Sequence, residues 1–165
     1  MDVKSRHHLR SDEVRRLEET VAEQLGVELD GDSYELVELT GAPFDLVLID
    51  GEPAAIEYEP REGRDAETFL TVRGANAHEP TRRVVTVDAG AIQFVSDGAD
   101  VMRPGIVDAD EVIEAGDLVV IGEASHGKFL AVGRALVDGE EMVGDSGKVV
   151  ESVHHVGDDL YEFSV

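Results

Sequence analysis

The chain has 165 residues, of which 37 are acidic and 14 are basic, so its formal net charge is −23. It contains no cysteine, which excludes disulfides, thiolate catalysis and cysteine-based zinc sites. Hydrophobic residues make up 42% of the chain, so a folded core is expected rather than a disordered acidic protein.

The acidic residues are spread evenly, with 20 in residues 1–81 and 17 in residues 82–165. This distribution argues against an acidic tail and favours a folded protein of a halophilic archaeon, adapted to molar salt. At 1 M salt the Debye length is about 3 Å, and a carboxylate surface keeps the protein in solution. Net charge then no longer excludes RNA as a partner, because counterion release contributes little there.

The N-terminus has no apolar leader, and no apolar run approaches the length of a transmembrane segment. A soluble cytoplasmic protein without a membrane partner is therefore expected.

Residues 11–25 predict a helix, because their apolar residues fall on one face. Ser11 is the expected N-cap, and Asp12 and Glu13 in the first turn complement the helix dipole. Gly26 supplies a left-handed stop.

Short strands are expected after this helix, and Asp50-Gly51 between two apolar runs indicates a hairpin. The predicted strands are residues 34–39, 44–50, 54–59 and 68–73. Residues 74–83, "GANAHEPTRR", are poor in apolar side chains and are interpreted as a domain boundary. The boundary separates an α+β domain, residues 1–81, from a second domain, residues 82–165.

The second half predicts a small, mostly-β barrel with one or two short helices, because short strands alternate with glycine turns. Asp88 is expected to cap a short helix that Gly98 ends, and Pro104-Gly105 marks a turn. The predicted strands are residues 84–88, 100–106, 117–124, 128–137, 147–156 and 160–163.

Four segments of the second half resemble the PUA domain, which is named for pseudouridine synthases and archaeosine transglycosylases. They are "VDAGAIQFVSDGADVMRPGI" (87–106), "GDLVVI" (116–121), "LAVGRALV" (130–137) and "GKVVESVHHVGDDLYEF" (147–163). The first half is similar to the pre-PUA domain of the malignant T-cell amplified sequence proteins and their archaeal relatives, a family linked to translation. That similarity lies in "DVKSRHHLR" (2–10), "LIDGEPAAIEYE" (48–59) and "ETFLTVR" (67–73).

The resemblance implies an RNA-binding cleft between the short helix and the strand that follows it. The candidate contacts are Gly90, Gly98, Ala99, Val101, Met102, Arg103, Pro104, Gly105 and Lys148. Gly98 and Ala99 would let a nucleotide backbone approach the main chain, and Arg103 would offer a planar fork to phosphate or a base edge. Met102 is interpreted as a core residue rather than a stacking surface.

Five of the 14 bases lie in the first 16 residues, which suggests a second contact with RNA or the ribosome. The candidate residues are Lys4, Arg6, His7 and Arg10; the alternative is a solvated helix start. His154 and His155 are adjacent on a predicted strand and face opposite sides, so they cannot share one metal ion. No metal and no cofactor are expected.

The sequence therefore predicts a non-enzymatic RNA-binding protein in translation or in tRNA and rRNA handling, whose cleft holds an RNA end or stem junction. Expected partners are tRNA or rRNA and a ribosomal subunit or translation-factor protein. No nucleophile elbow, phosphate loop or metal cluster is visible. The alternative is an accessory subunit of an RNA-modifying enzyme of the pseudouridine synthase or tRNA-guanine transglycosylase type.

Overall fold

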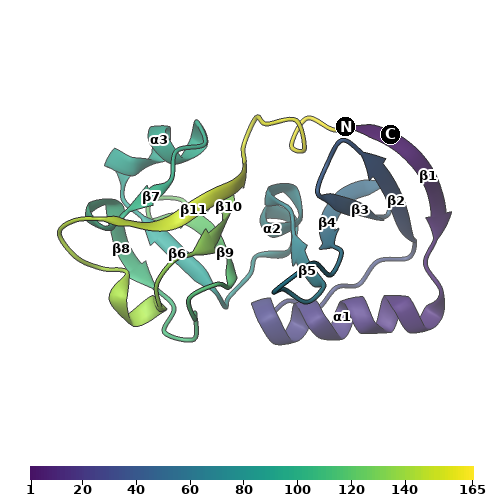
Figure 1. The fold of residues 1–165 in the computed structure, drawn as a ribbon, viewed down its shortest axis with the longest axis horizontal. Coiled ribbons are helices and arrows are strands. Elements are labelled where there is room, and N and C mark those ends of the chain that lie inside the picture. Colours follow the sequence, from purple (N-terminus) through teal and green to yellow (C-terminus); the bar gives the residue numbers. More distant parts are fainter.

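The computed structural model describes residues 1–165, which form two β-sheets with short helices around them (Figure 1). The first part of the chain forms β1 (Asp2–His8), α1 (Ser11–Leu25), β2 (Tyr34–Thr40), β3 (Phe44–Ile49), β4 (Glu52–Tyr58), β5 (Glu67–Leu70) and α2 (Val72–His78). The rest forms β6 (Val84–Val87), α3 (Ile92–Ser96), β7 (Val101–Met102), β8 (Ile106–Ala109), β9 (Leu118–Glu123), β10 (Phe129–Ala135) and β11 (Lys148–His155). None of the helices combines the length and the apolar character that crossing a bilayer requires.

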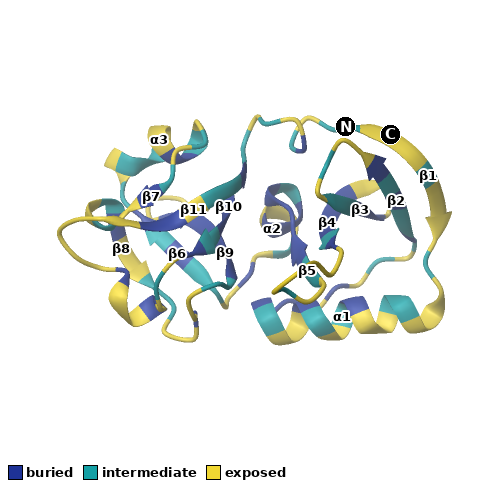
Figure 2. Cartoon of the chain, in the orientation of Figure 1, coloured by how far each residue is buried: buried dark blue, intermediate teal, exposed yellow.

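The first sheet has the strand order β1-β2-β3-β4-β5, and every neighbouring pair is antiparallel. The Asp50-Gly51 turn joins β3 to β4 as expected, with both residues at positive φ. On α1 the side chains of Leu17, Val21 and Leu25 are buried (Figure 2). This sheet and α1 are the expected α+β part of the fold.

The second sheet has the order β7-β11-β10-β9-β6-β8 and curls into a nearly closed barrel. Its two outermost strands, β7 and β8, are joined only by the short 3₁₀ turn Arg103–Gly105. Four peptide units reach at most about 14 Å, so the two edges of the sheet must come close together. The expected fold class, an α+β part followed by a mostly-β pseudo-barrel, is confirmed.

The two sheets share part of their apolar core. A cluster of 25 buried residues centred on the first sheet extends to Leu118, Val120, Phe129 and Val132 of the second sheet. A separate cluster of 14 buried residues fills the barrel. The first sheet therefore packs directly on the outside of the barrel.

The helix α1 starts one residue earlier than its expected cap implies, because Arg10 occupies the N-cap position and Ser11 is already helical. The carboxylate of Glu13 accepts a hydrogen bond from the Arg10 backbone N–H (3.0 Å). The helix ends as expected at Gly26, which has φ 68°.

The helix α2 was not expected, because residues 74–83 have the glycine and asparagine content of a loop. Thr71 caps it by accepting the Gly74 N–H (2.9 Å). A Cβ atom on Gly74 would lie 2.0 Å from the Ala54 carbonyl oxygen of β4. This glycine therefore permits close packing of α2 on the sheet, rather than breaking the helix.

Three further expectations differ from the structure. The strands β1 and β8 were not predicted, and the predicted strand at residues 160–163 is wrong, because these residues form turns. The Asp158 carboxylate accepts the backbone N–H groups of His155 and Tyr161, both at 2.9 Å. This local cap turns the chain away from the sheet and carries Leu160 into the core of the first sheet.

Candidate functional site

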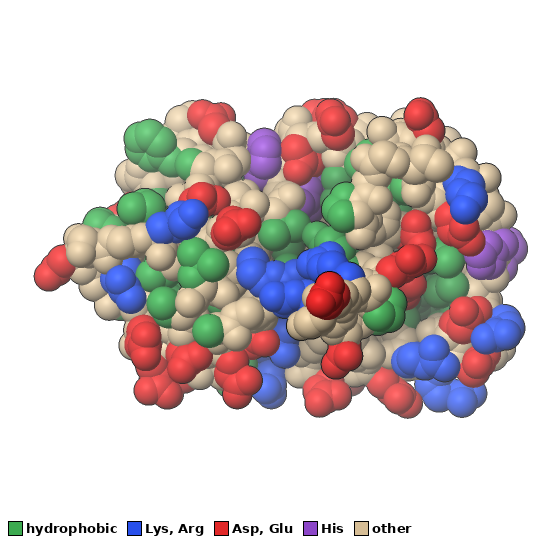
Figure 3. Space-filling model, in the orientation of Figure 1, with side chains coloured by type: hydrophobic (Ala, Val, Ile, Leu, Met, Phe, Trp, Pro, Cys, Tyr) green, Lys and Arg blue, Asp and Glu red, His purple; other side chains and the backbone are tan.

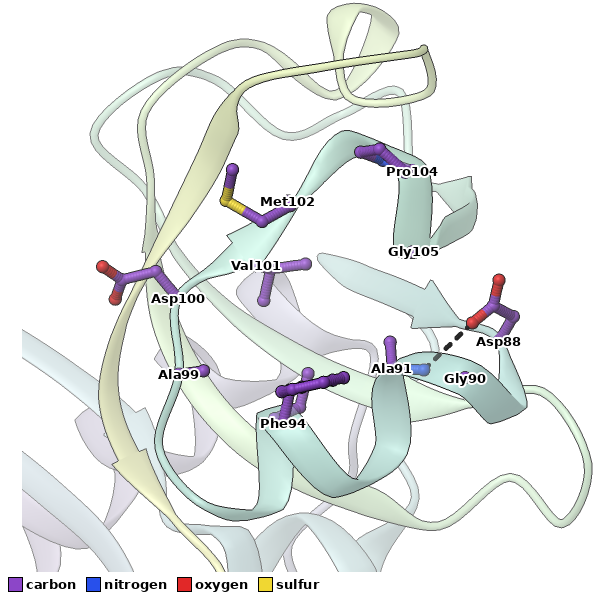
Figure 4. Close-up of a pocket in the computed structure, with 11 residues that line it drawn as sticks. Asp88, Gly90, Ala91, Phe94, Ala99, Asp100, Val101, Met102, Pro104 and Gly105 are labelled. Carbon is purple, nitrogen blue, oxygen red and sulfur yellow. Dashed lines mark hydrogen bonds between the residues drawn. The ribbon is translucent and has the colours of Figure 1, made fainter.

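A cavity of about 440 Å³ opens where α3, β7 and the Arg103–Gly105 turn meet (Figure 4). Six of its eleven lining residues are hydrophobic. The lining consists of Asp88, Gly90, Ala91, Phe94, Val95, Ala99, Asp100, Val101, Met102, Pro104 and Gly105. The structure thus brings six of the candidate contacts into one cavity: Gly90, Ala99, Val101, Met102, Pro104 and Gly105.

Two large apolar side chains are exposed at this cavity. Phe94 is 66% exposed and Met102 is 49% exposed. In Figure 4 the Phe94 ring lies on one side of the cavity, and Met102 and Pro104 lie on the other. The expectation that Met102 belongs to the core is therefore wrong. Large apolar side chains that are exposed on the two sides of one cavity are typical of a binding surface.

Phe94 was missed as a site residue. Its signal was nevertheless present, because Val95 is the buried residue of α3. At 100° per residue, the position before a buried residue turns well away from the core. An aromatic side chain at such a position in a short helix is a surface residue, which a check of helical phase would have found.

The backbone around the cavity is held by a few short contacts. The Asp88 side chain accepts the Ala91 N–H (3.1 Å), which confirms its expected capping role. The Asp88 N–H donates to the Gly105 carbonyl (2.9 Å). A Cβ atom on Gly105 would lie 2.9 Å from the Ala91 Cβ, so only glycine lets the turn approach the helix this closely.

Gly98 lies outside the cavity lining, and the structure corrects the reason expected for it. Its φ is 92°, and an added Cβ would lie 2.7 Å from the His155 ring. The His155 ring therefore occupies the space that was expected to admit a nucleotide backbone.

Arg103 and Lys148 lie beside the cavity rather than in its lining. Arg103 donates to two carbonyl oxygens of the loop before β11, from Nε to Glu141 and from Nη1 to Ser146, both at 2.9 Å. This gives Arg103 a structural role that was not expected. Lys148 pairs with Met102 across β11 and β7, and its Nζ lies 3.4 Å from an Asp100 carboxylate oxygen.

The cavity itself is acidic rather than free of carboxylates, because Asp88 and Asp100 belong to its lining. Apolar walls with two carboxylates suit a neutral planar ring that carries N–H donors, and they repel a phosphate from the interior.

The basic N-terminal residues lie far from this cavity, because β1 and α3 are at opposite ends of the molecule (Figure 1). Arg6 Nη2 contacts Glu35 Oε2 at 2.7 Å, and this hydrogen bond lowers the pKa of Glu35. Arg10 lies 3.5 Å from an Asp12 carboxylate oxygen and 3.4 Å from one of Glu13. Lys4 and His7 are exposed on β1.

The two adjacent histidines serve different contacts. His154 is 1% exposed; its Nε2 accepts the Val72 N–H (3.1 Å), so its Nδ1 carries the proton and donates to Asp158 (2.8 Å). Burial by itself would raise the pKa of Asp158, but the hydrogen bonds from His154, Tyr161 and His155 outweigh it, and the pKa is lowered. His155 Nδ1 instead donates to the Ser96 carbonyl (3.0 Å). His154 thus joins β11 to the start of α2.

The fold and this cavity define a class of protein. The PUA domain family matches residues 83–157, which include the whole cavity. A structure titled as a conserved PUA domain protein from Thermoplasma acidophilum superposes with a TM-score of 0.78 and 30% identity, covering 95% of this chain and 97% of that one. The chain therefore belongs to the PUA-domain proteins.

Other relatives extend the similarity over the first sheet. A hypothetical protein from Pyrococcus horikoshii has a TM-score of 0.81 and 29% identity, covering 96% of this chain and 98% of that one. An uncharacterised protein of Methanocaldococcus jannaschii is 40% identical over 121 residues, 73% of this chain and 71% of that protein. Translation machinery-associated protein 20 of Saccharomyces cerevisiae is 39% identical over 88 residues, 49% of each protein.

Proposed function

We propose that the protein binds RNA without catalysing a reaction, acts in translation, and holds an unpaired nucleotide at an RNA end in the cavity. The observation that carries this proposal is the exposure of Phe94 and Met102 on the two sides of a cavity in a PUA domain. The name of the yeast relative supports the link to translation.

The chemistry of the cavity fits an unstacked base. Proteins read RNA mostly at single-stranded ends and loops, where bases stack on aromatic side chains. Phe94 offers such a face, and the carboxylates of Asp88 and Asp100 can accept hydrogen bonds from the amino groups of a base. The phosphates would remain outside, beside Lys148, whose exposed contact with Asp100 is weak.

The lining supports binding rather than catalysis. Apart from two carboxylates it offers only apolar side chains and backbone, and Asp88 already serves as a helix cap. A general acid or base would need a proton-accepting group aimed at a reacting atom. We therefore assign the cavity to recognition.

A second contact, with a ribosomal subunit or a translation-factor protein, is proposed at β1. This strand is the outer edge of the first sheet, so one side of its backbone is unpaired. Lys4 and His7 are exposed on it, and Arg6 and Arg10 add positive charge. This contact lies at the opposite end of the molecule from the cavity (Figure 1), so one bound assembly can engage both.

The test of the cavity is Phe94→Ala, with Val107→Ala on β8 as the control, because Val107 is 51% exposed and lies outside the lining. Loss of one stacked base weakens binding by about 1–3 kcal/mol, which is about 5- to 150-fold. Binding is measured by fluorescence anisotropy at high salt, with deacylated tRNA and with tRNA that lacks its unpaired end.

The expected result is that Phe94→Ala weakens binding of complete tRNA, has little effect on the truncated tRNA, and leaves the melting temperature nearly unchanged. Wild-type affinity of the folded Phe94→Ala protein for complete tRNA would overturn the assignment of the cavity.

A further inference from the structure

Positive side chains gather over the middle of the face drawn in Figure 3, where the β4–β5 hairpin lies against the second sheet. Arg61 and Arg64 come from this hairpin, and Arg134 comes from β10. Arg64 Nη1 and Arg134 Nη1 donate to the same oxygen, the Gly116 carbonyl, at 3.1 Å and 2.9 Å. We call Arg61, Arg64 and Arg134 the junction cluster.

In the junction cluster, two of the three guanidinium groups lie near one carboxylate, that of Glu67. Glu67 Oε2 lies 2.7 Å from Arg134 Nη1, but Glu67 Oε1 lies 3.7 Å from Arg64 Nη1 and makes no hydrogen bond. Arg61 forms no ion pair; its guanidinium lies 5.4 Å from the centre of the buried Tyr58 ring. In a chain with 37 acidic residues, the fold thus keeps three like charges together with a single partner.

The hairpin presents two of these arginines in a defined position. Arg61 and Arg64 exchange both of their backbone hydrogen bonds, each at 2.9 Å, across a two-residue turn. Gly63 in that turn has φ 77°. The turn fixes the backbone positions of Arg61 and Arg64, so little backbone ordering is needed when a ligand binds, which favours binding.

We propose that the junction cluster binds the phosphate backbone of the RNA whose end occupies the cavity; this inference rests on the proposed function. Guanidinium groups match the geometry of phosphate and stay charged at all working pH values. The junction cluster and the region of α3 and β7 are both visible on the face in Figure 3. An RNA strand that leaves the cavity can therefore cross this face to the junction cluster.

Two carboxylates on the same hairpin provide an independent test of the proposal. Glu62 and Asp65 are exposed, and neither lies within ion-pair distance of the three guanidinium groups. They lower the local positive potential without neutralising a particular arginine. Removing them should therefore strengthen the binding of phosphate, which would not occur if the cluster only stabilised the fold.

The test compares Arg61→Gln/Arg64→Gln with Arg15→Gln/Arg16→Gln, which removes the same charge from α1 outside the cluster. We expect the cluster variant to bind tRNA about tenfold more weakly, with the slope of log K against log salt reduced by about 1–2. The α1 control should change both values little, and Glu62→Gln/Asp65→Asn should bind tRNA a few-fold more tightly.

A ribotrinucleotide that occupies only the cavity separates this proposal from the proposed function. The cluster variant should bind it with wild-type affinity, whereas Phe94→Ala should not. Because Arg64 also bonds Gly116, a thermal melt accompanies each titration, and Arg61→Gln alone repeats the test with a side chain that makes no hydrogen bond.

Wild-type affinity and salt slope of the cluster variants for tRNA would overturn the proposal, even if Phe94→Ala loses the trinucleotide. Polyglutamate serves as a second probe, which stands for an acidic protein partner. If the cluster variant loses binding to polyglutamate but binds tRNA as the wild type does, the proposal is also overturned, and the junction cluster is assigned to an acidic protein. If the wild-type protein binds neither RNA, both proposals fail.

Discussion

The cavity and the buried His154 site, which consists of His154, Val72 and Asp158, differ in how their side chains are covered. At the cavity, Phe94 and Met102 expose large apolar surfaces that nothing in the protein covers. At the His154 site, the imidazole is buried and both of its ring nitrogens have partners, Val72 and Asp158. A buried polar group without a partner is costly, whereas an exposed apolar group can be removed with little effect on the fold. Changes at the His154 site should therefore alter stability, and changes at the cavity should alter binding.

The largest expected effect on stability is that of His154→Ala. It leaves the Val72 N–H and the Asp158 carboxylate without their partner and opens a cavity in a fully packed region. We expect a loss of about 2–4 kcal/mol, measured by denaturant unfolding at high salt. His126→Ala is the control, because the His126 side chain is 80% exposed, and a loss of equal size there would contradict the comparison.

The same variant tests the proposed division into domains 1–81 and 82–165. We expect protease to cut wild-type protein slowly in the segment 79–83, between α2 and β6, because His154 and the shared core hold the two sheets together. In His154→Ala this cut should become faster and release a stable C-terminal fragment. General digestion without such a fragment would show that the second sheet is not an independent domain.

A smaller loss of stability is expected for Gly98→Ala. This position lies between the cavity and β11, so the variant tests where the effect on stability begins. The change combines a strained positive φ with a contact of 2.7 Å to His155, so it should destabilise the protein by about 1–3 kcal/mol. Gly116→Ala isolates the strain, since Gly116 has φ 96° and nothing within 4 Å of its added Cβ. Equal losses for the two variants would mean that the His155 contact is relieved at no cost.

The hydrogen bond between His154 and Asp158 should also weaken in acid. The folded pKa of Asp158 lies below its ordinary value of 3.8, so its stabilisation is present above pH 3.8 and disappears as the pH falls through the lowered folded pKa. Asp158→Ala should lose about 1–2 kcal/mol at neutral pH. The difference between wild type and variant, followed by unfolding across a pH series, should shrink below about pH 4. A difference independent of pH would assign the loss to packing.

The smallest effect on stability is expected for Met102→Ala at the cavity. Exposed positions without special contacts change stability by at most about 0.5 kcal/mol, so the melting temperature should stay nearly constant. The affinity for the ribotrinucleotide should nevertheless fall, because one wall of the cavity is lost. A large loss of stability would contradict this assignment and show that Met102 is a core residue.

Several elements followed from the sequence alone, because the groups that define them lie within a few residues of one another. The stop at Gly26, the Asp50-Gly51 hairpin and the Asp88 cap depend on local dihedral preferences and local hydrogen bonds. The turn at Pro104-Gly105 likewise depends on local dihedral preferences. The family resemblance of residues 87–106 likewise directed attention to the segment where the cavity lies.

Other features were decided only by the tertiary structure, because their partners are far away in the chain. Gly74 lies in a helix because the Ala54 backbone packs against it, and Gly98 is required by the His155 ring. Arg103 bonds carbonyls about 40 residues away, and residues 160–163 leave the sheet to cover the first core. Local composition describes what a segment can form on its own, whereas packing between distant strands determines which polar groups are satisfied and which apolar side chains, such as Met102, remain exposed.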